Sequence, residues 1–253
     1  MMLTEQHAYG NRWRAVSADA KAAFAALALV AAFVAHPPVA LAIAVVMGGV
    51  TMLGAGVPVR SYARVATAPW SFLLVSAVTL AVSVQLGGPG WLPVSIAIEP
   101  DQVAHALAVV SRSVAALSAM LFLALTTPMT DMIALARRLR VPSTLVEMMT
   151  ICYRSLFVLS EAVHDMGRAQ TARLGYSSWR TSIRSMGTAV ALLAVETWRR
   201  SIVMYQASVA RGGGEELRFL EPRRDGGLRH LAMALAAGAA LIVAAAIVPG
   251  GLR

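Results

Sequence analysis

The chain has 253 residues, of which 58% are hydrophobic and only 14% are charged. A soluble domain carries about 25% charged residues, so this composition excludes an ordinary soluble protein. The formal net charge is +9, and Lys21 is the single lysine among many arginines. The apolar runs make membrane topology a better explanation of these arginines than nucleic-acid binding. Cys152 is the lone cysteine, which excludes a disulfide framework and a cysteine-based zinc site.

Five apolar segments predict an all-α integral membrane protein with about five transmembrane helices. The first apolar run begins near Ala22, and no small-residue cleavage motif follows it cleanly, so we expect no cleavable signal peptide. A turn is expected at His36-Pro37-Pro38, between the first two spans. The five segments are 22–35, 39–57, 69–86, 103–125 and 231–248. The first is short for a span and reaches the required length of about 20 residues only with the flanking residues 18–21.

An arginine-rich block separates the fourth and fifth spans, and it predicts a helical domain inserted before the last span. Its apolar and charged positions alternate as they do in amphipathic helices. We expect helices at 129–140, at 143–173 with Ser143 as the N-cap, and at 178–211 before the glycines 212–214. The predicted domains are 1–127 with the first four spans, 128–226 for the arginine-rich block, and 227–253 with the last span.

Basic residues alternate between loops, which predicts the orientation in the membrane. They occur in the N-terminal segment, in the expected loop 58–68 with Arg60 and Arg64, and in the arginine-rich block. The turns at 36–38 and 87–102 contain no lysine or arginine. The positive-inside rule therefore predicts a cytoplasmic N-terminus, a cytoplasmic arginine-rich block and an external C-terminus.

A ten-residue pattern occurs twice in the arginine-rich block. Residues 166–175 and 204–213 both read M-x-x-A-x-x-A-R-x-G. An arginine followed by glycine is an ordinary helix stop, favoured by the helix dipole and the left-handed cap. Two copies in register favour a docking device as strongly as an ordinary helix stop, because each copy presents a forked and permanently charged arginine tip.

Few residues of this chain suggest chemistry. Arg112, with His105 and Asp101 nearer the outer end of the fourth span, is either a substrate or lipid contact or an arginine that pairs within the bundle. Glu161, His164 and Asp165 have a spacing that can ligate metal, although on an arginine-rich helix they suit ion pairs with Arg154 or Arg168.

No nucleotide-binding or nucleophile motif can be read from the sequence, so we expect a non-enzymatic chain without its own energy source. Two equivalent arginine tips imply two equivalent partner subunits, and a pair of ATPases fits this requirement.

The chain resembles the T components of energy-coupling factor transporters, in particular the cobalt-type CbiQ proteins. Ala210-Arg211-Gly212 matches the Ala-Arg-Gly motif of that family, whereas Ala172-Arg173-Leu174-Gly175 departs from it by Leu174. The N-terminal stretch 8–14, with Lys21 following, is similar to the opening of cobalt-type members.

The resemblance implies the transmembrane coupling component of an ATP-driven cobalt importer in the cell (inner) membrane. Two copies of an ABC-type ATPase would dock on the chain, and a separate substrate-binding membrane subunit would hold the cobalt ion. The chain itself would bind no cofactor, metal, ATP or nucleic acid. The implied docking residues are Ala172, Arg173, Gly175, Ala210, Arg211 and Gly212.

Three alternatives remain open from the sequence. The chain is also compatible with a nickel or vitamin T component. A self-contained channel or secondary transporter would use Arg112, His105 and Asp101 as its path. A membrane-anchored scaffold would lay its basic helices on anionic lipid.

Overall fold

The computed structural model describes residues 10–81, 83–86, 94–97, 100–212 and 227–247. Contacts between residues divide the chain into two compact units, 1–132 with 222–253 and 133–221. The predicted boundary at 226 falls outside the described residues, and the three-domain division stays a prediction.

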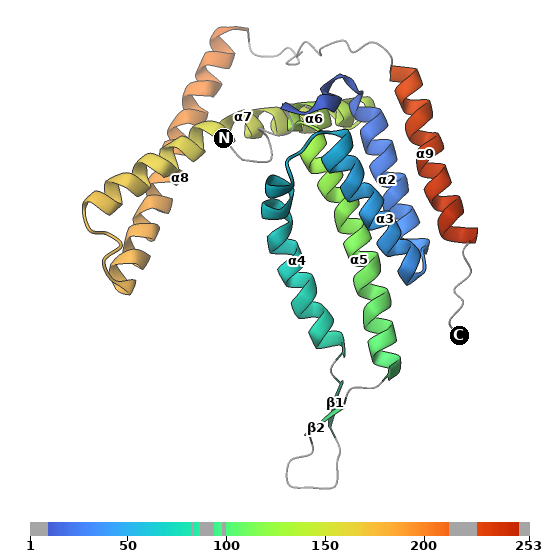
Figure 1. The fold of residues 1–253 in the computed structure, drawn as a ribbon. Coiled ribbons are helices and arrows are strands. Elements are labelled where there is room, and N and C mark those ends of the chain that lie inside the picture. The colour runs from blue at the N-terminus through green and yellow to red at the C-terminus, as the bar shows by residue number, and fades with distance from the viewer. Residues whose placement is uncertain (1–9, 82, 87–93, 98–99, 213–226, 248–253) are drawn as a thin grey trace. The chain divides into compact units, whose positions relative to one another are not determined.

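The first unit is a helical bundle with one small hairpin (Figure 1). A short hairpin of β1 (Ser83–Leu86) antiparallel to β2 (Val94–Ala97) connects two of the bundle helices, α4 and α5. The helical elements are η1 (Arg12–Ala15), α2 (Ala18–Val34), α3 (Pro37–Gly49), the π-helical turn η2 (Val50–Gly54), α4 (Val59–Ala81), α5 (Pro100–Thr126) and α9 (Gly227–Ile247).

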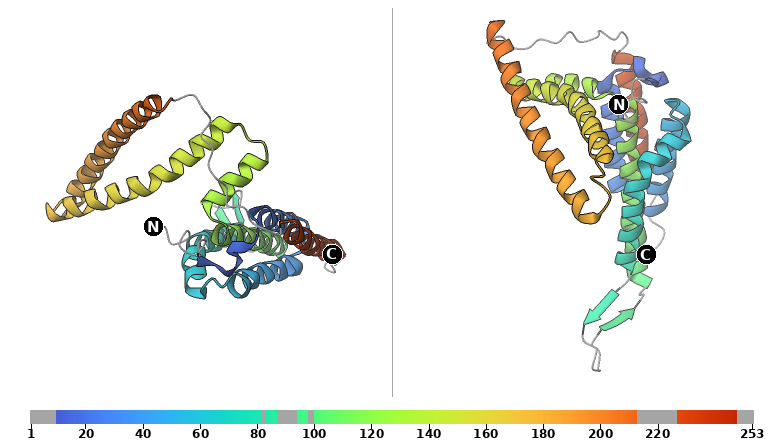
Figure 2. Two further views of the ribbon diagram at one scale, coloured as in Figure 1. Left: turned by 90° about the horizontal axis from the view of Figure 1, so that it is seen from above. Right: turned by 90° about the vertical axis from the view of Figure 1, so that its left-hand side faces the viewer.

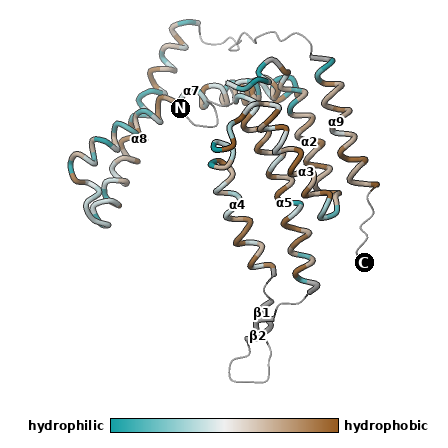
Figure 3. The backbone as a smooth tube through the Cα atoms, viewed as in Figure 1, coloured by the Kyte–Doolittle hydropathy of each residue, from teal (hydrophilic) through white to brown (hydrophobic). Residues whose placement is uncertain are grey.

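Apolar helices long enough to cross a membrane confirm the predicted fold class, an α-helical integral membrane protein. In the described part of the chain, four segments meet this requirement: Pro37–Gly54, Val59–Leu80, Gln102–Thr126 and Arg229–Ile247. Figure 3 shows the hydrophobic colouring along them. Helix α2 has 17 residues, which gives it a length of about 26 Å against a hydrocarbon core of about 30 Å. The number of five spans therefore stays a prediction.

The predicted bounds of the third span are wrong at both ends. Pro69 was expected to begin the helix, but α4 begins at Val59 and continues through Pro69. Proline often breaks a helix, so the sequence predicts the start of the span at Pro69. A helix within a membrane bundle nevertheless tolerates an internal proline. Residues 83–86 form β1 and do not belong to the helix. The sequence did not reveal this, because a short apolar run does not distinguish a strand from the end of a helix. The expected loop 58–68 is thus mostly helical.

The two prolines after His36 start a helix where a turn was expected. Pro37 and Pro38 occupy the first positions of α3. Proline suits these positions because its fixed φ angle is helical and its missing N–H group would have no partner there. The reversal of the chain is consequently short, and α2 and α3 follow one another closely.

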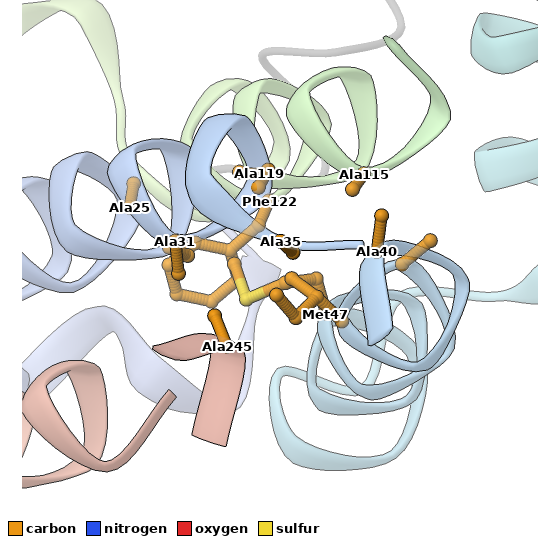
Figure 4. Close-up of a cluster of buried hydrophobic side chains, with 13 residues drawn as sticks. Ala25, Ala31, Ala35, Ala40, Met47, Ala115, Ala119, Phe122 and Ala245 are labelled. Atoms are coloured by element: carbon orange, nitrogen blue, oxygen red, sulfur yellow. The ribbon is translucent and has the colours of Figure 1, made fainter. Parts of the chain in front are cut away.

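Alanine lines the core of the bundle, and Phe122 is the large side chain at its centre (Figure 4). Phe122 is fully buried, and the rings of Trp13 and Phe24 contact it edge-on at centroid distances of 6.0 and 5.6 Å. Small side chains let helix backbones approach closely, which is how membrane helices gain packing energy without a hydrophobic driving force. The alanines of this core are Ala25, Ala28, Ala31, Ala32, Ala35, Ala40, Ala44, Ala115, Ala119 and Ala245.

Helix α9 packs against α2 through a glycine. A Cβ atom on Gly238 would lie 2.5 Å from Cδ1 and 2.7 Å from Cβ of Leu27. Non-bonded carbon atoms do not approach this closely, so any side chain at 238 separates the two helices.

We expect Gly238→Ala to lower the stability of the bundle by about 1–2 kcal/mol, because overpacking outweighs the gain in helix propensity. Gly49→Ala is the matched control, since a Cβ on helical Gly49 meets nothing within 4 Å. The control should be neutral or slightly stabilising. Thermal unfolding in detergent measures both variants, and equal midpoints would contradict the close contact with Leu27.

The second unit contains two long helices joined by a tight turn. Helix α6 (Met129–Arg138) leads into it, followed by α7 (Ser143–Ala172) and α8 (Trp179–Ala210). Figure 2 shows α7 and α8 diverging from the turn between them. The three predicted helices are confirmed to within two residues at each end. The predicted N-cap is wrong, because Pro142 holds that position, without a side-chain cap bond, and Ser143 is already helical.

Candidate functional site

The two arginine tips have the same backbone geometry. Arg173 is the C-cap of α7 with φ −91° and ψ 15°, and Arg211 is the C-cap of α8 with φ −98° and ψ 18°. The next residue is left-handed in both copies, with φ 57° at Leu174 and 84° at Gly212. The sequence departure at Leu174 therefore leaves the shape of the helix end unchanged.

Hydrogen bonds explain how a leucine adopts this conformation. The Leu174 N–H group donates to the Thr171 carbonyl at 3.0 Å, and the Gly175 N–H group donates to the Gln170 carbonyl at 2.8 Å. This pair of bonds is a Schellman motif, which satisfies carbonyls that the helix end would leave unpaired. A left-handed leucine costs about 1–2 kcal/mol, so the motif must offset that strain.

Gly175 is required for space and not for a positive φ angle. A Cβ there would lie 2.5 Å from the Ser185 hydroxyl oxygen and 2.9 Å from the Gln170 carbonyl oxygen. The Ser185 hydroxyl donates to the Gly175 carbonyl at 3.0 Å and so ties α8 to the end of α7. The left-handed cap is Gly212 in the second copy and Leu174 in the first, whose cap geometry the sequence left open.

The start of α8 is fixed by a capping box. The Ser178 N–H group donates to Oγ1 of Thr181 at 3.0 Å, and the Thr181 N–H group donates to Oγ of Ser178 at 3.4 Å. These reciprocal bonds satisfy two donors at the helix start. The turn between α7 and α8 is therefore held from both sides.

Large apolar side chains accompany both arginine tips. Arg173 and Arg211 are exposed, as are Ala172, Ala210 and Gly212, while Gly175 is half-buried. Trp179, the first residue of α8, is 80% exposed, and Tyr205, in the last two turns of α8, is 71% exposed. Arginine, tryptophan and tyrosine dominate the binding energy of protein interfaces.

The two tips lie at opposite ends of one helix. Arg173 precedes α8 by a short turn, whereas Arg211 follows its last residue. Helix α8 has 32 residues, and a straight helix of that length spans about 48 Å. The two surfaces are therefore too far apart for a single small partner.

Arg112 pairs within the bundle. Its Nε atom donates to the Ala35 carbonyl at 3.2 Å, and Ala35 is the C-cap of α2. An arginine at a helix C-terminus satisfies a carbonyl and opposes the negative end of the dipole. His105 is exposed, and the side chain of Asp101 lies outside the described residues. The hydrogen bond supports the interpretation of Arg112 as a residue that pairs within the bundle.

Glu161, His164 and Asp165 are exposed on α7. Asp165 forms the predicted ion pair with Arg168 at 3.2 Å. The described residues contain no group of three or more His, Cys, Asp or Glu side chains suited to a metal ion. An ion pair exposed to this degree contributes less than about 1 kcal/mol.

Sequence reasoning missed a buried polar contact at the cytoplasmic end predicted for the bundle. The amide of Asn11 and the ammonium of Lys21 both donate to the Thr126 carbonyl, at 2.8 and 2.9 Å. The available signal was the position of the only lysine within the first turn of an apolar helix. The partner, Thr126, is 105 residues away from Lys21 and carries no sequence signal of its own.

Apolar spanning helices together with a polar helical hairpin define a multi-pass membrane protein. Residues 10–219 match the sequence profile of the family described as cobalt transport protein, CbiQ. The chain belongs to this family and is thus a membrane component of cobalt transport. The N-terminal resemblance and the arginine motifs pointed to the same family.

Curated relatives agree with this assignment. The chain is 34% identical over 207 residues to the cobalt transport protein CbiQ of Rhodobacter capsulatus, covering 82% of each chain. It is 31% identical over 205 residues to the protein of the same name from Salmonella typhimurium, covering 78% of this chain and 89% of the relative. A provisionally named fused cobalt transport protein, CbiMQ, of Methanocorpusculum labreanum is 27% identical over 103 residues, covering 41% of this chain and 17% of the relative.

We expect Gly175→Ala to loosen the turn between α7 and α8. The added methyl group displaces Ser185 or the Gln170 carbonyl, and overpacking of this kind costs about 1–3 kcal/mol. Hydrogen exchange of the amides at 173–178 should accelerate about tenfold or more, because local opening becomes easier. Gly167→Ala is the control, since a Cβ on Gly167 meets nothing within 4 Å. Equal exchange rates in both variants would contradict the spatial role of Gly175.

Proposed function

We propose that this chain is the transmembrane coupling (T) component of an ATP-driven cobalt importer of the energy-coupling factor type. The observation that carries the proposal is the matching geometry of the two arginine tips. Two docking points with one backbone shape suit two copies of one partner. Membership of the cobalt transport family supplies the substrate, and the resemblance to T components supplies the kind of partner.

The chemistry of the tips suits a protein groove. The Arg173 and Arg211 guanidinium groups each offer a fork of N–H donors, which bind carboxylates or backbone carbonyls. The exposed Trp179 and Tyr205 add apolar area on α8, the helix that separates the two tips. We infer that each tip inserts into one subunit of a pair of ABC-type ATPases, which hydrolyse ATP outside this chain.

The predicted orientation supports the same proposal. The positive-inside rule places the N-terminus and the arginine-rich block on the cytoplasmic side of the cell membrane, where ATP is available. The chain then transmits movement and does no chemistry. Catalytic, nucleotide-binding and metal-binding roles belong, on this proposal, to other subunits.

A separate membrane subunit is proposed to capture the cobalt ion. The name of the Methanocorpusculum labreanum relative describes a fusion of CbiM and CbiQ, which supports a second membrane component beside this chain. Cobalt is the substrate of the complex and is held by that component. A nickel-specific complex would differ in that subunit and not in the arginine tips.

We expect Arg173→Ala and Arg211→Ala each to weaken copurification of the ATPases about tenfold or more, because a hydrogen bond to a charged group contributes about 1.5–3 kcal/mol. The double variant should abolish ATP-dependent cobalt uptake. Lysine at either position should restore only part of the binding, because it lacks the planar fork. Arg199→Ala is the control, since Arg199 is exposed on α8 about three turns before the helix ends.

Undiminished copurification of the ATPases with the double variant would overturn the coupling role. Cobalt flux through vesicles that contain this chain alone would favour the self-contained channel instead. Loss of binding to anionic lipid, with uptake unaffected, would favour the scaffold.

A further inference from the structure

The carbonyl of Thr126, the last residue of α5, accepts hydrogen bonds from two side chains near the N-terminus. Nδ2 of Asn11 lies 2.8 Å away and Nζ of Lys21 lies 2.9 Å away. Lys21 is 2% exposed, Asn11 is 9% exposed and Thr126 is fully buried. We refer to Asn11, Lys21 and Thr126 as the polar joint.

A buried ammonium group is an unusual way to fill space. Removing a charge from water is costly unless the group is hydrogen-bonded, and an apolar side chain would occupy the same volume without that cost. The C-terminal end of a helix carries partial negative charge, so the ammonium is favourably placed at the end of α5. The lysine thus fixes one backbone atom, the Thr126 carbonyl oxygen, in one position.

The N-terminal segment beside the joint is anchored independently. The Arg12 N–H group donates to the Ala55 carbonyl at 3.1 Å. The Trp13 ring lies so close to Gly54 that a Cβ there would be 2.9 Å from it, and the same ring contacts Phe122. The segment that carries Asn11 therefore connects the end of η2 to the end of α5.

Along the sequence, Thr126 of the polar joint directly precedes the arginine-rich block. Only Thr127 and Pro128 separate α5 from α6. The hydroxyls of Ser17 and Thr127 are buried without a hydrogen-bond partner among the described residues. Neighbouring polar groups are therefore available to form new hydrogen bonds if the end of α5 shifts.

We propose that Lys21, assisted by Asn11, is a positioning residue for transport. It holds the last turn of α5, so that α5 is displaced as a whole when the arginine-rich block moves. Without the Lys21 ammonium group, the last turn of α5 opens, and the displacement does not reach the rest of the helix. This inference rests on the proposed coupling function.

The test uses the complete complex in proteoliposomes, with cobalt uptake measured per ATP hydrolysed. Lys21→Met keeps the length of the side chain and removes the ammonium. Its uptake per ATP should fall about tenfold, within the range of typical coupling energies, while ATPase copurification and ATP hydrolysis remain. Lys21→Arg should restore part of the ratio, since a guanidinium also donates to a carbonyl. Arg64→Met is the control, because it removes an exposed cation from the same predicted side of the membrane.

Two results would overturn the inference. One is an unchanged uptake per ATP in Lys21→Met, and the other is a parallel loss of hydrolysis and uptake, which marks a purely structural residue. If the complex with Lys21→Met does not assemble, the uptake per ATP is measured with Asn11→Ala instead, because this variant removes one donor and leaves the Lys21 ammonium in place. An unchanged ratio in Asn11→Ala then overturns the inference.

Hydrogen exchange on the isolated chain separates this inference from the proposed function. Lys21→Met should accelerate exchange of the amides at 122–126 about tenfold relative to Arg64→Met, because opening of the last turn becomes easier. Absence of ATP-dependent uptake by the wild-type complex would refute the coupling function, whatever the exchange shows. Unchanged exchange would refute the joint, even if the wild-type complex transports cobalt.

Discussion

Close approach of helix backbones is the constraint on which the bundle depends. Lipid tails are as apolar as leucine, so membrane helices gain little from burying large apolar side chains and must gain from contact. Alanines of α2, α3 and α5 provide that contact around the ring of Phe122 (Figure 4). The glycine at 238 extends the same principle to α9.

The ends of the helices, in contrast, determine the surfaces available to partners. Helices α6, α7 and α8 are each followed by a left-handed residue, at Arg140, Leu174 and Gly212. Two of these are not glycine, so hydrogen bonds and packing, and not residue type alone, impose the conformation. The two arginines gain equivalent shapes from different sequences.

Local sequence patterns predicted most of the fold and the position of both arginine tips. Hydrophobic runs located the apolar helices, and the arginine and glycine stops located the ends of α7 and α8. Pro69 misled because a bundle tolerates proline inside a helix. The conformation of Leu174 and the contact of Lys21 with Thr126 were not predictable, because each depends on partners that sequence spacing does not reveal. The requirement for a small residue at Gly175 was not predictable either, because it depends on Ser185, in the next helix.

Helix α8 imposes a geometrical consequence on any pair of partners. Its 32 residues behave as a rod, because hydrogen bonds along the axis prevent it from shortening. Two bodies attached at its ends keep a constant separation along that rod. Such bodies can move relative to one another only by tilting the rod or by rotating about its ends. Their relative movement is therefore a rotation, and the capped turn at residues 173–178 is one of its pivots.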